Sequence, residues 1–198
     1  KTTQQNHEIN RMRFKLIQSK YLDMNDVFKP FEEDLAYFSE EDYQNLIPFI
    51  LEKDIPSIQE YVNNRILSYE RIVLFYLYRI RKFESDSTKS LNAIIALNPN
   101  VLDEARKRDA ERTNKNATSQ KIYGMPIFLK DNINTKGLPT TAGAFALKDF
   151  IPEKNAFVIK KLVEAGAIII GKSIMAEWAF SPMHTESSTG GITYNPYN

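Results

Sequence analysis

The stretch "YGMPIFLKDNINTKGLPTTAG", residues 123–143, contains the side chain with the clearest capacity for chemistry, Lys130. The apolar run before it predicts a buried strand, and Lys130 follows that strand directly. Burying an ammonium ion is costly, so this placement indicates either an ion pair or a functional amine. Asp131 is adjacent, but neighbouring strand residues point to opposite faces, which makes it a poor partner. If functional, a buried neutral amine could act as a general base toward a serine hydroxyl.

A second stretch, "GAIIIGKS", formally matches the phosphate-binding pattern G-x-x-x-x-G-K-S from Gly166 to Ser173. Three consecutive isoleucines favour an extended strand and resist the turn that a phosphate loop requires. The segment before Gly166 also has a helical pattern, where the motif demands a strand. We therefore predict a helix, a C-capping Gly166 and a buried strand, with Lys172 solvated or hydrogen-bonded at the strand end.

The bulk composition excludes several classes of site. The chain has 198 residues, a net charge of +1, no cysteine and two histidines, His7 and His184. Thiol catalysis and cysteine-based metal sites are excluded, and no basic surplus indicates nucleic acid as a partner. The longest strongly apolar run, residues 72–78, is far shorter than the ~20 residues of a membrane helix. We expect no membrane span, and the compartment, cytoplasmic or exported after leader removal, is left open.

Helical and strand patterns alternate along the chain, which favours an α/β architecture. Residues 1–40 are predicted to form an extension on the surface. Strands are expected at 91–97, 124–129 and 167–171. Helices are expected near 43–50, after caps at Ser57 and Ser68, over 98–113, over 155–166 with a buried stripe of Val158, Leu162 and Ala165, and as a short helix over 173–180.

Several of these segments together resemble the amidase signature family. "YGMPIFLKDNINTKGLPTTAGAFAL", "NAFVIKKLVEAGAIIIGKSIMAEWAF" and "GGITYNPYN" occur in the family's order, and the match covers roughly residues 45–198. "EWAF…GGITYNPYN" leans toward the peptide-amidase-like branch. The resemblance implies a partial amidase-signature fold, with helices packed on a mixed β-sheet and an α-helical N-terminal region. Residues 1–44 would form an N-terminal extension, and residues 45–198 the N-terminal part of the amidase-signature domain.

The resemblance also assigns roles. It implies amide hydrolysis by a Ser–cis-Ser–Lys triad in which Lys130 is the catalytic lysine, and it implies no metal or organic cofactor. Asp131 and Asn132 are interpreted as supporting the turn after Lys130. Ser181 and Met183 are candidates for the acyl pocket.

The chain departs from the family pattern in one respect. The Gly-Ser-rich signature that carries the bridging serine, with the nucleophilic serine a little beyond it, would follow the "NPY" segment, and the chain ends before it. "ESSTGG", residues 186–191, precedes that landmark, and we interpret Ser187, Ser188 and Thr189 as loop residues. This chain is therefore expected to be inactive alone and to pair with the C-terminal remainder of the same enzyme.

Two alternatives remain at this point. One is an amidotransferase-type subunit that passes ammonia to a partner, and the other is a non-catalytic interaction module that uses the aromatic-rich helices. The substrate would be a small-molecule or peptide amide. A Lys130 lying in bulk water, or locked to a carboxylate, would argue against the hydrolase interpretation.

Overall fold

The computed structural model describes residues 8–9, 23–112, 121–180 and 185–197. Its centre is a three-stranded sheet in the order β1-β3-β2. The strands are β1 (Ile94–Leu97), β2 (Pro126–Lys130) and β3 (Ile168–Ser173). β3 runs parallel to β2 and antiparallel to β1. The sheet is therefore mixed, as the sequence predicts.

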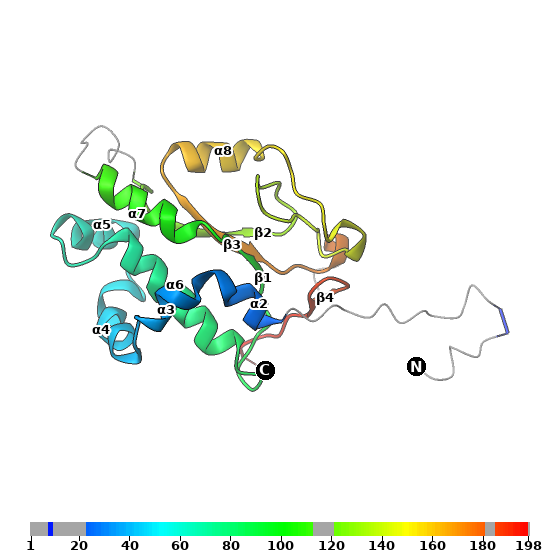
Figure 1. The fold of residues 1–198 in the computed structure, drawn as a ribbon. Coiled ribbons are helices and arrows are strands. Elements are labelled where there is room, and N and C mark those ends of the chain that lie inside the picture. Colours follow the sequence, from blue (N-terminus) through cyan, green and yellow to red (C-terminus); the bar gives the residue numbers. More distant parts are fainter. Residues whose placement is uncertain (1–7, 10–22, 113–120, 181–184, 198) are drawn as a thin grey trace.

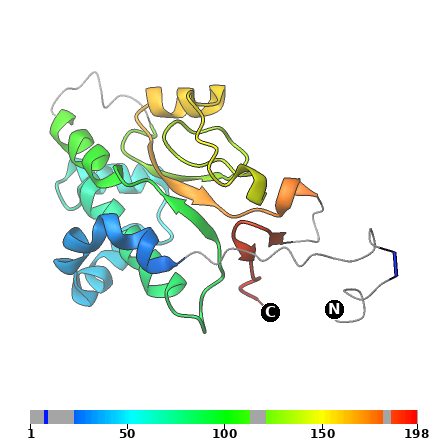
Figure 2. The ribbon, with the colours of Figure 1, turned by 45° about the vertical axis from the view of Figure 1, so that its right-hand side comes forward.

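Helices cover both faces of this sheet (Figure 1). α8 and the chain that follows β2 lie on one side, whereas α6, α7 and the helices before them lie on the other, and Figure 2 shows the same layers after a turn. The alternation along β3 explains the arrangement, because successive strand side chains face opposite ways. Ile168 and Ile170 belong to the large core shared with the helices, whereas Ile169 belongs to a small core with Ile159 of α8.

The helical region precedes and overlaps the sheet in sequence. Its elements are α2 (Met24–Phe28), the 3₁₀ turn η2 (Lys29–Phe31), α3 (Glu32–Ala36), α4 (Glu40–Ile50), α5 (Ile55–Asn63), α6 (Tyr69–Glu84) and α7 (Val101–Glu111). Ser68 caps α6 as predicted, by accepting a hydrogen bond from the Arg71 amide. The cap predicted at Ser57 is wrong. Asp54 caps α5 instead, by accepting a hydrogen bond from the Ser57 amide, and Pro56 fits the first helical turn, where its missing N–H needs no partner.

The expectation that residues 1–40 lie on the surface is wrong for residues 28–38, although the described residues 8 and 9 are exposed. Four apolar side chains of this segment are buried in the large core: Phe28, Phe31, Leu35 and Phe38. Their spacing follows consecutive short helical turns rather than one long helix, which is why the pattern is hard to recognise. A domain boundary at residue 44 remains a prediction.

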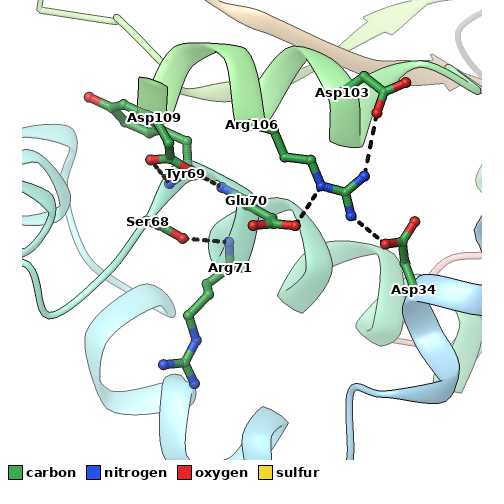
Figure 3. A network of polar contacts seen from close by, with 8 residues as sticks. All are labelled: Asp34, Ser68, Tyr69, Glu70, Arg71, Asp103, Arg106 and Asp109. Atoms are coloured by element: carbon green, nitrogen blue, oxygen red, sulfur yellow. Dashed lines mark hydrogen bonds and ion pairs between the residues drawn. The ribbon is translucent and has the colours of Figure 1, made fainter. Parts of the chain in front are cut away.

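Arg106 joins three of these helices on the surface (Figure 3). Its guanidinium on α7 donates to Glu70 of α6 at 2.7 Å, and it pairs with Asp34 of α3 and, at 3.4 Å, with Asp103. The hydrogen bonds to Glu70 and then to Asp34 raise the pKa of Arg106. The same figure shows Asp109 of α7 accepting hydrogen bonds from the first amides of α6, so a carboxylate of one helix also stabilises the start of another.

α8 (Phe157–Glu164) ends as the sequence predicts. Gly166 follows it with φ +89°, a conformation that glycine adopts without strain, and β3 begins two residues later. The expected stripe is wrong in one position. Val158 is 53% exposed, and Ile159 is the buried residue of this helix.

Short elements complete the fold. They are η4 (Phe145–Leu147), η5 (Glu177–Ala179) and a hairpin of β4 (Glu186–Ser187) and β5 (Gly191–Ile192). η5 replaces the short helix predicted over 173–180, because Trp178 and Ala179 have positive φ and cannot continue a right-handed helix. Among the described residues, no helix is long and apolar enough to span a bilayer.

Candidate active site

Lys130 is the last residue of β2, and its side chain is exposed. Leu129 faces the small core below α8, so Phe128 and Lys130 share the opposite face of the strand. Phe128 on that face is also 37% exposed. The prediction that Lys130 is buried is therefore wrong for this chain, because the described helices do not bury this end of β2, and the exposure argues against catalysis by this chain alone. Among the described residues Lys130 has no ion pair, so it is not locked to a carboxylate.

The loop that follows Lys130, residues 131–143, is organised around the buried carboxylate of Asp131. Asp131 accepts hydrogen bonds from the amides of Thr141 and Gly143, both at 3.1 Å, and from the Thr141 hydroxyl. Its own amide donates to the carbonyl of Ser173 on β3. Asn132, by contrast, is exposed, and its side chain has no hydrogen bond to another described residue. Of the two residues expected to support this turn, the structure brings only Asp131 into the loop's hydrogen bonding.

The β4–β5 hairpin packs against the far end of this loop. The Ser187 hydroxyl donates to the Gly143 carbonyl at 2.9 Å and lies 2.9 Å from the Thr189 hydroxyl, which lies 3.3 Å from that of Thr141. Ser188 accepts a hydrogen bond from the Phe145 amide at 2.8 Å. Ser187, Ser188 and Thr189 are buried; the two serine hydroxyls bind backbone groups, and the Thr189 hydroxyl contacts the hydroxyls of Ser187 and Thr141.

Gly143 ends the loop after Lys130 and lies against both the β4–β5 hairpin and the segment that follows β3. It has φ +73°, and a Cβ there would lie 2.8 Å from the Met175 carbonyl oxygen. Any side chain would therefore clash with backbone and also adopt a strained conformation. This close approach allows Ser187 and Thr189 to contact the Gly143 carbonyl.

Lys172 on β3 is the buried cation of this region, with 0% of its side chain exposed. The expectation of a solvated lysine is wrong, and that of a hydrogen-bonded lysine is confirmed. Its Nζ donates to the Ile133 carbonyl at 2.6 Å and to the hydroxyls of Thr140 at 3.0 Å and Thr135 at 3.4 Å. Burial lowers the pKa of Lys172 to about 8, and the charge of Asp131 partly opposes that change.

The position of Lys172 in the sequence carries a signal for its burial. The residue follows four buried positions of the central strand, a context in which lysine is rare unless it is hydrogen-bonded. The prediction of a solvated strand end did not take this context into account. The phosphate-loop hypothesis for the same stretch is excluded, because Gly166 ends a helix and residues 168–173 form an extended strand.

The acyl-pocket candidates Ser181 and Met183 lie outside the described residues. Shortly before them in the sequence, Trp178 and Ala179 both have positive φ, at 54° and 53°. The Trp178 side chain is 59% exposed. Among the described residues, no group of three or more histidine, cysteine or carboxylate side chains could hold a metal ion.

Comparison with known proteins gives consistent similarities. The family model described as Amidase matches residues 71–198. A protein named "Probable amidase" from Arabidopsis thaliana is 40% identical over 154 residues, which are 75% of this chain and 29% of that protein. A subunit of the glutamyl-tRNA(Gln) amidotransferase from Lawsonia intracellularis is 39% identical over 143 residues, which are 67% of this chain and 29% of that protein.

Solved structures show the same similarity. An amidase family protein from Bacillus anthracis superposes with a TM-score of 0.80 at 31% identity, covering 91% of this chain and 37% of that one. The peptide amidase from Stenotrophomonas maltophilia superposes with a TM-score of 0.69 at 35% identity, covering 75% of this chain and 31% of that one. The chain thus spans about a third of the length of these relatives. The family match includes β2, the loop after it and β3, and on this evidence the chain belongs to the amidase signature family.

Proposed function

We propose that the protein carrying this chain is an amide hydrolase that cleaves a carboxylic amide to an acid and ammonia or an amine. The observation that carries the proposal is Lys130, which lies at the carboxyl end of β2 inside the region matched by the family. The names of the plant and Stenotrophomonas relatives support the same reaction class. In this role Lys130 accepts a proton from a bridging serine, which deprotonates a nucleophilic serine that attacks the amide carbonyl.

A general base of this kind must be held away from bulk water, and in this chain the Lys130 face of β2 is open. We infer that further polypeptide covers it, since the chain spans 29% of the length of its plant relative. The proposed partner is thus the remainder of the same enzyme. It would supply both serines, the backbone amides that bind the oxyanion, and the wall that buries Phe128 together with Lys130.

The buried hydroxyls of the β4–β5 hairpin support the proposal that the catalytic serines come from the remainder of the enzyme. Ser187 and Ser188 already contact the Gly143 carbonyl, at 2.9 and 3.4 Å. A nucleophile needs a hydroxyl directed at the substrate and an adjacent base. We therefore propose that these serines hold the hairpin and that the nucleophile is supplied from elsewhere.

The experiment is to express the full-length protein and to measure ammonia release from simple amides and from C-terminal peptide amides. Lys130→Ala should lower kcat/KM by about 10²- to 10⁴-fold, the range expected for loss of a general base. Lys136→Ala, which replaces an exposed lysine of the following loop, is the matched control and should leave the rate unchanged. An unchanged rate in Lys130→Ala would remove Lys130 from the mechanism. Robust turnover by residues 1–198 alone, abolished by Ser188→Ala, would contradict the proposal that the catalytic serines come from the remainder of the enzyme.

A second candidate is an amidotransferase-type subunit, favoured by the 39% identity to the Lawsonia protein. Such a protein would release ammonia from glutamine and transfer it to a partner subunit. Dependence of turnover on glutamine and on a second subunit would favour this candidate. Turnover of peptide amides by the isolated protein would favour the hydrolase.

A further inference from the structure

A buried lysine and a buried aspartate bind different parts of the loop that follows Lys130. Lys172 contacts the acceptor groups of this loop, namely the Ile133 carbonyl and the Thr135 and Thr140 hydroxyls. Asp131 contacts its donor groups, the amides of Thr141 and Gly143. Thr140 and Thr141 are consecutive, so one peptide unit lies between the hydrogen bonds to the cation and those to the anion.

Each of the three N–H donors of Lys172 has an oxygen acceptor in the loop. A lysine ammonium has three N–H donors and no acceptor, and three oxygens surround this Nζ at 2.6 to 3.4 Å. All three oxygens are uncharged, and no carboxylate among the described residues contacts Nζ. The charged group that acts on it is Asp131, whose field favours the ammonium form.

These contacts continue to the proposed catalytic lysine through the backbone. The Ile133 carbonyl accepts from Lys172, and the Ile133 amide donates to the Lys130 carbonyl at 3.0 Å. The Ala142 amide donates to the Asp131 carbonyl at 3.3 Å, which closes the loop next to the strand end. The position of the Lys130 main chain therefore depends on the residue whose carbonyl Lys172 holds.

We propose that Lys172 is a positioning residue of this enzyme, which fixes loop 131–143 on β3 and thereby sets the place of Lys130 at the end of β2. The inference rests on the proposed hydrolase function and extends it to a side chain on the opposite face of the sheet. By strand register, Lys172 lies beside Leu129, whose side chain faces the small core, whereas Lys130 lies on the other face. Lys172 thus acts without touching the substrate.

A purely space-filling role is a poor explanation for a charged side chain at this point. Burying an ammonium is costly, and an apolar side chain of similar length would fill the same volume at lower cost. Three directed hydrogen bonds to one loop are what the apolar side chain could not provide. Misplacement of a catalytic group by about 1 Å can lower a rate by about 100-fold, so loop placement is a sufficient reason to retain the charge.

The test uses the full-length protein with Lys172→Met, which keeps length and removes the donors. We expect kcat to fall about 10- to 100-fold with KM changed less than about twofold, since the substrate contacts remain in place. Amide hydrogen exchange should accelerate at Ile133, Thr141 and Gly143. Lys136→Met, which replaces an exposed lysine of the same loop, is the control and should change neither kcat nor the rate of amide hydrogen exchange.

A pair of substitutions at Thr140 tests the same contact if Lys172→Met fails to fold. Thr140→Val removes one acceptor of Lys172 and should lower kcat. Thr140→Ser keeps the hydroxyl and should keep kcat near that of the unmodified protein. Normal kcat and normal loop protection in Lys172→Met, or equal effects of Thr140→Val and Thr140→Ser, would overturn the inference. The exchange measurement needs no substrate. Lost protection in a protein that hydrolyses no amide would therefore support the placement of the loop and refute the proposed function alone.

Discussion

The helical region, residues 23–112, and the described part of the region from β2 to the hairpin, residues 121–180 and 185–192, differ in the balance between apolar and polar burial. The large core contains 23 buried hydrophobic residues, 19 of which lie in the helical region, whereas the small core below α8 contains four. Buried polar side chains show the reverse distribution. Asn98 is the one found in the helical region, and eight are found among the residues that the structure describes between 131 and 189. Apolar packing therefore forms the scaffold, and directed hydrogen bonds determine the geometry of the candidate site.

This difference has a physical consequence for substitutions. Apolar packing contributes to the free energy of unfolding in proportion to the buried area. A buried polar group that loses its hydrogen-bond partner instead carries the full cost of its desolvation. Changes in the helical region should thus lower global stability. Changes in the second region should in addition alter local order and the proposed chemistry, because they break the hydrogen bonds that hold the loop after Lys130.

The largest effect on stability is expected for Phe75→Ala in α6. Phe75 is fully buried and stacks on Tyr43 of α4 at 4.8 Å between ring centroids. Its truncation should lower the free energy of unfolding by about 3–5 kcal/mol, through lost burial and the cavity left behind. Urea unfolding of the full-length protein measures this change. Phe157→Ala, at a position 76% exposed, is the control and should stay within about 0.5 kcal/mol. Equal losses in both variants would contradict the expectation that burial of Phe75 stabilises the helical region.

The difference between the two regions also explains how much the sequence could predict. The three strands, α8 and its capping Gly166 follow from apolar runs and glycine placement, which are local signals. The fold class follows from their alternation with helices and from the family resemblance. The burial of Phe28 and Phe31 could not be predicted, because in short irregular helices it depends on contacts distant in sequence.

The candidate site was less predictable for a related reason. Lys130 was located by its strand, but its exposure depends on what covers β2, which no local pattern encodes. The burial of Asp131, Lys172 and Thr140 depends on a loop folding back over β3. Such polar contacts have no periodicity, so a single sequence does not reveal them.

A smaller effect, specific to the second region, is expected from the titration of Lys172. Burial lowers its folded-state pKa to about 8 from 10.5, so between these values the unfolded chain retains a proton that the folded protein releases. Because the unfolded state then binds more protons, the free energy of unfolding should rise with pH across this window. The gain is on the order of 3 kcal/mol, from about 1.4 kcal/mol for each pKa unit.

The measurement compares urea unfolding of the unmodified protein and of Lys172→Met from pH 7 to 10. The difference in stability should increase in favour of the unmodified protein as pH rises, while contributions from tyrosines cancel because both proteins contain them. Lys136→Met should show no such trend. A pH-independent difference for Lys172→Met would show that Lys172 titrates alike in both states.

The smallest effect is expected on the surface of the helical region, where Arg106 is 42% exposed among Asp34, Glu70 and Asp103. Exposed ion pairs contribute little, so Arg106→Met should cost about 1 kcal/mol, and the loss should shrink in 1 M salt. Arg81→Met, at an exposed arginine of α6 that has no ion pair among the described residues, is the control for removing one positive charge. A loss above about 2 kcal/mol that salt does not reduce would mean that polar contacts also determine the stability of the helical region. The contrast between the two regions would then be one of degree.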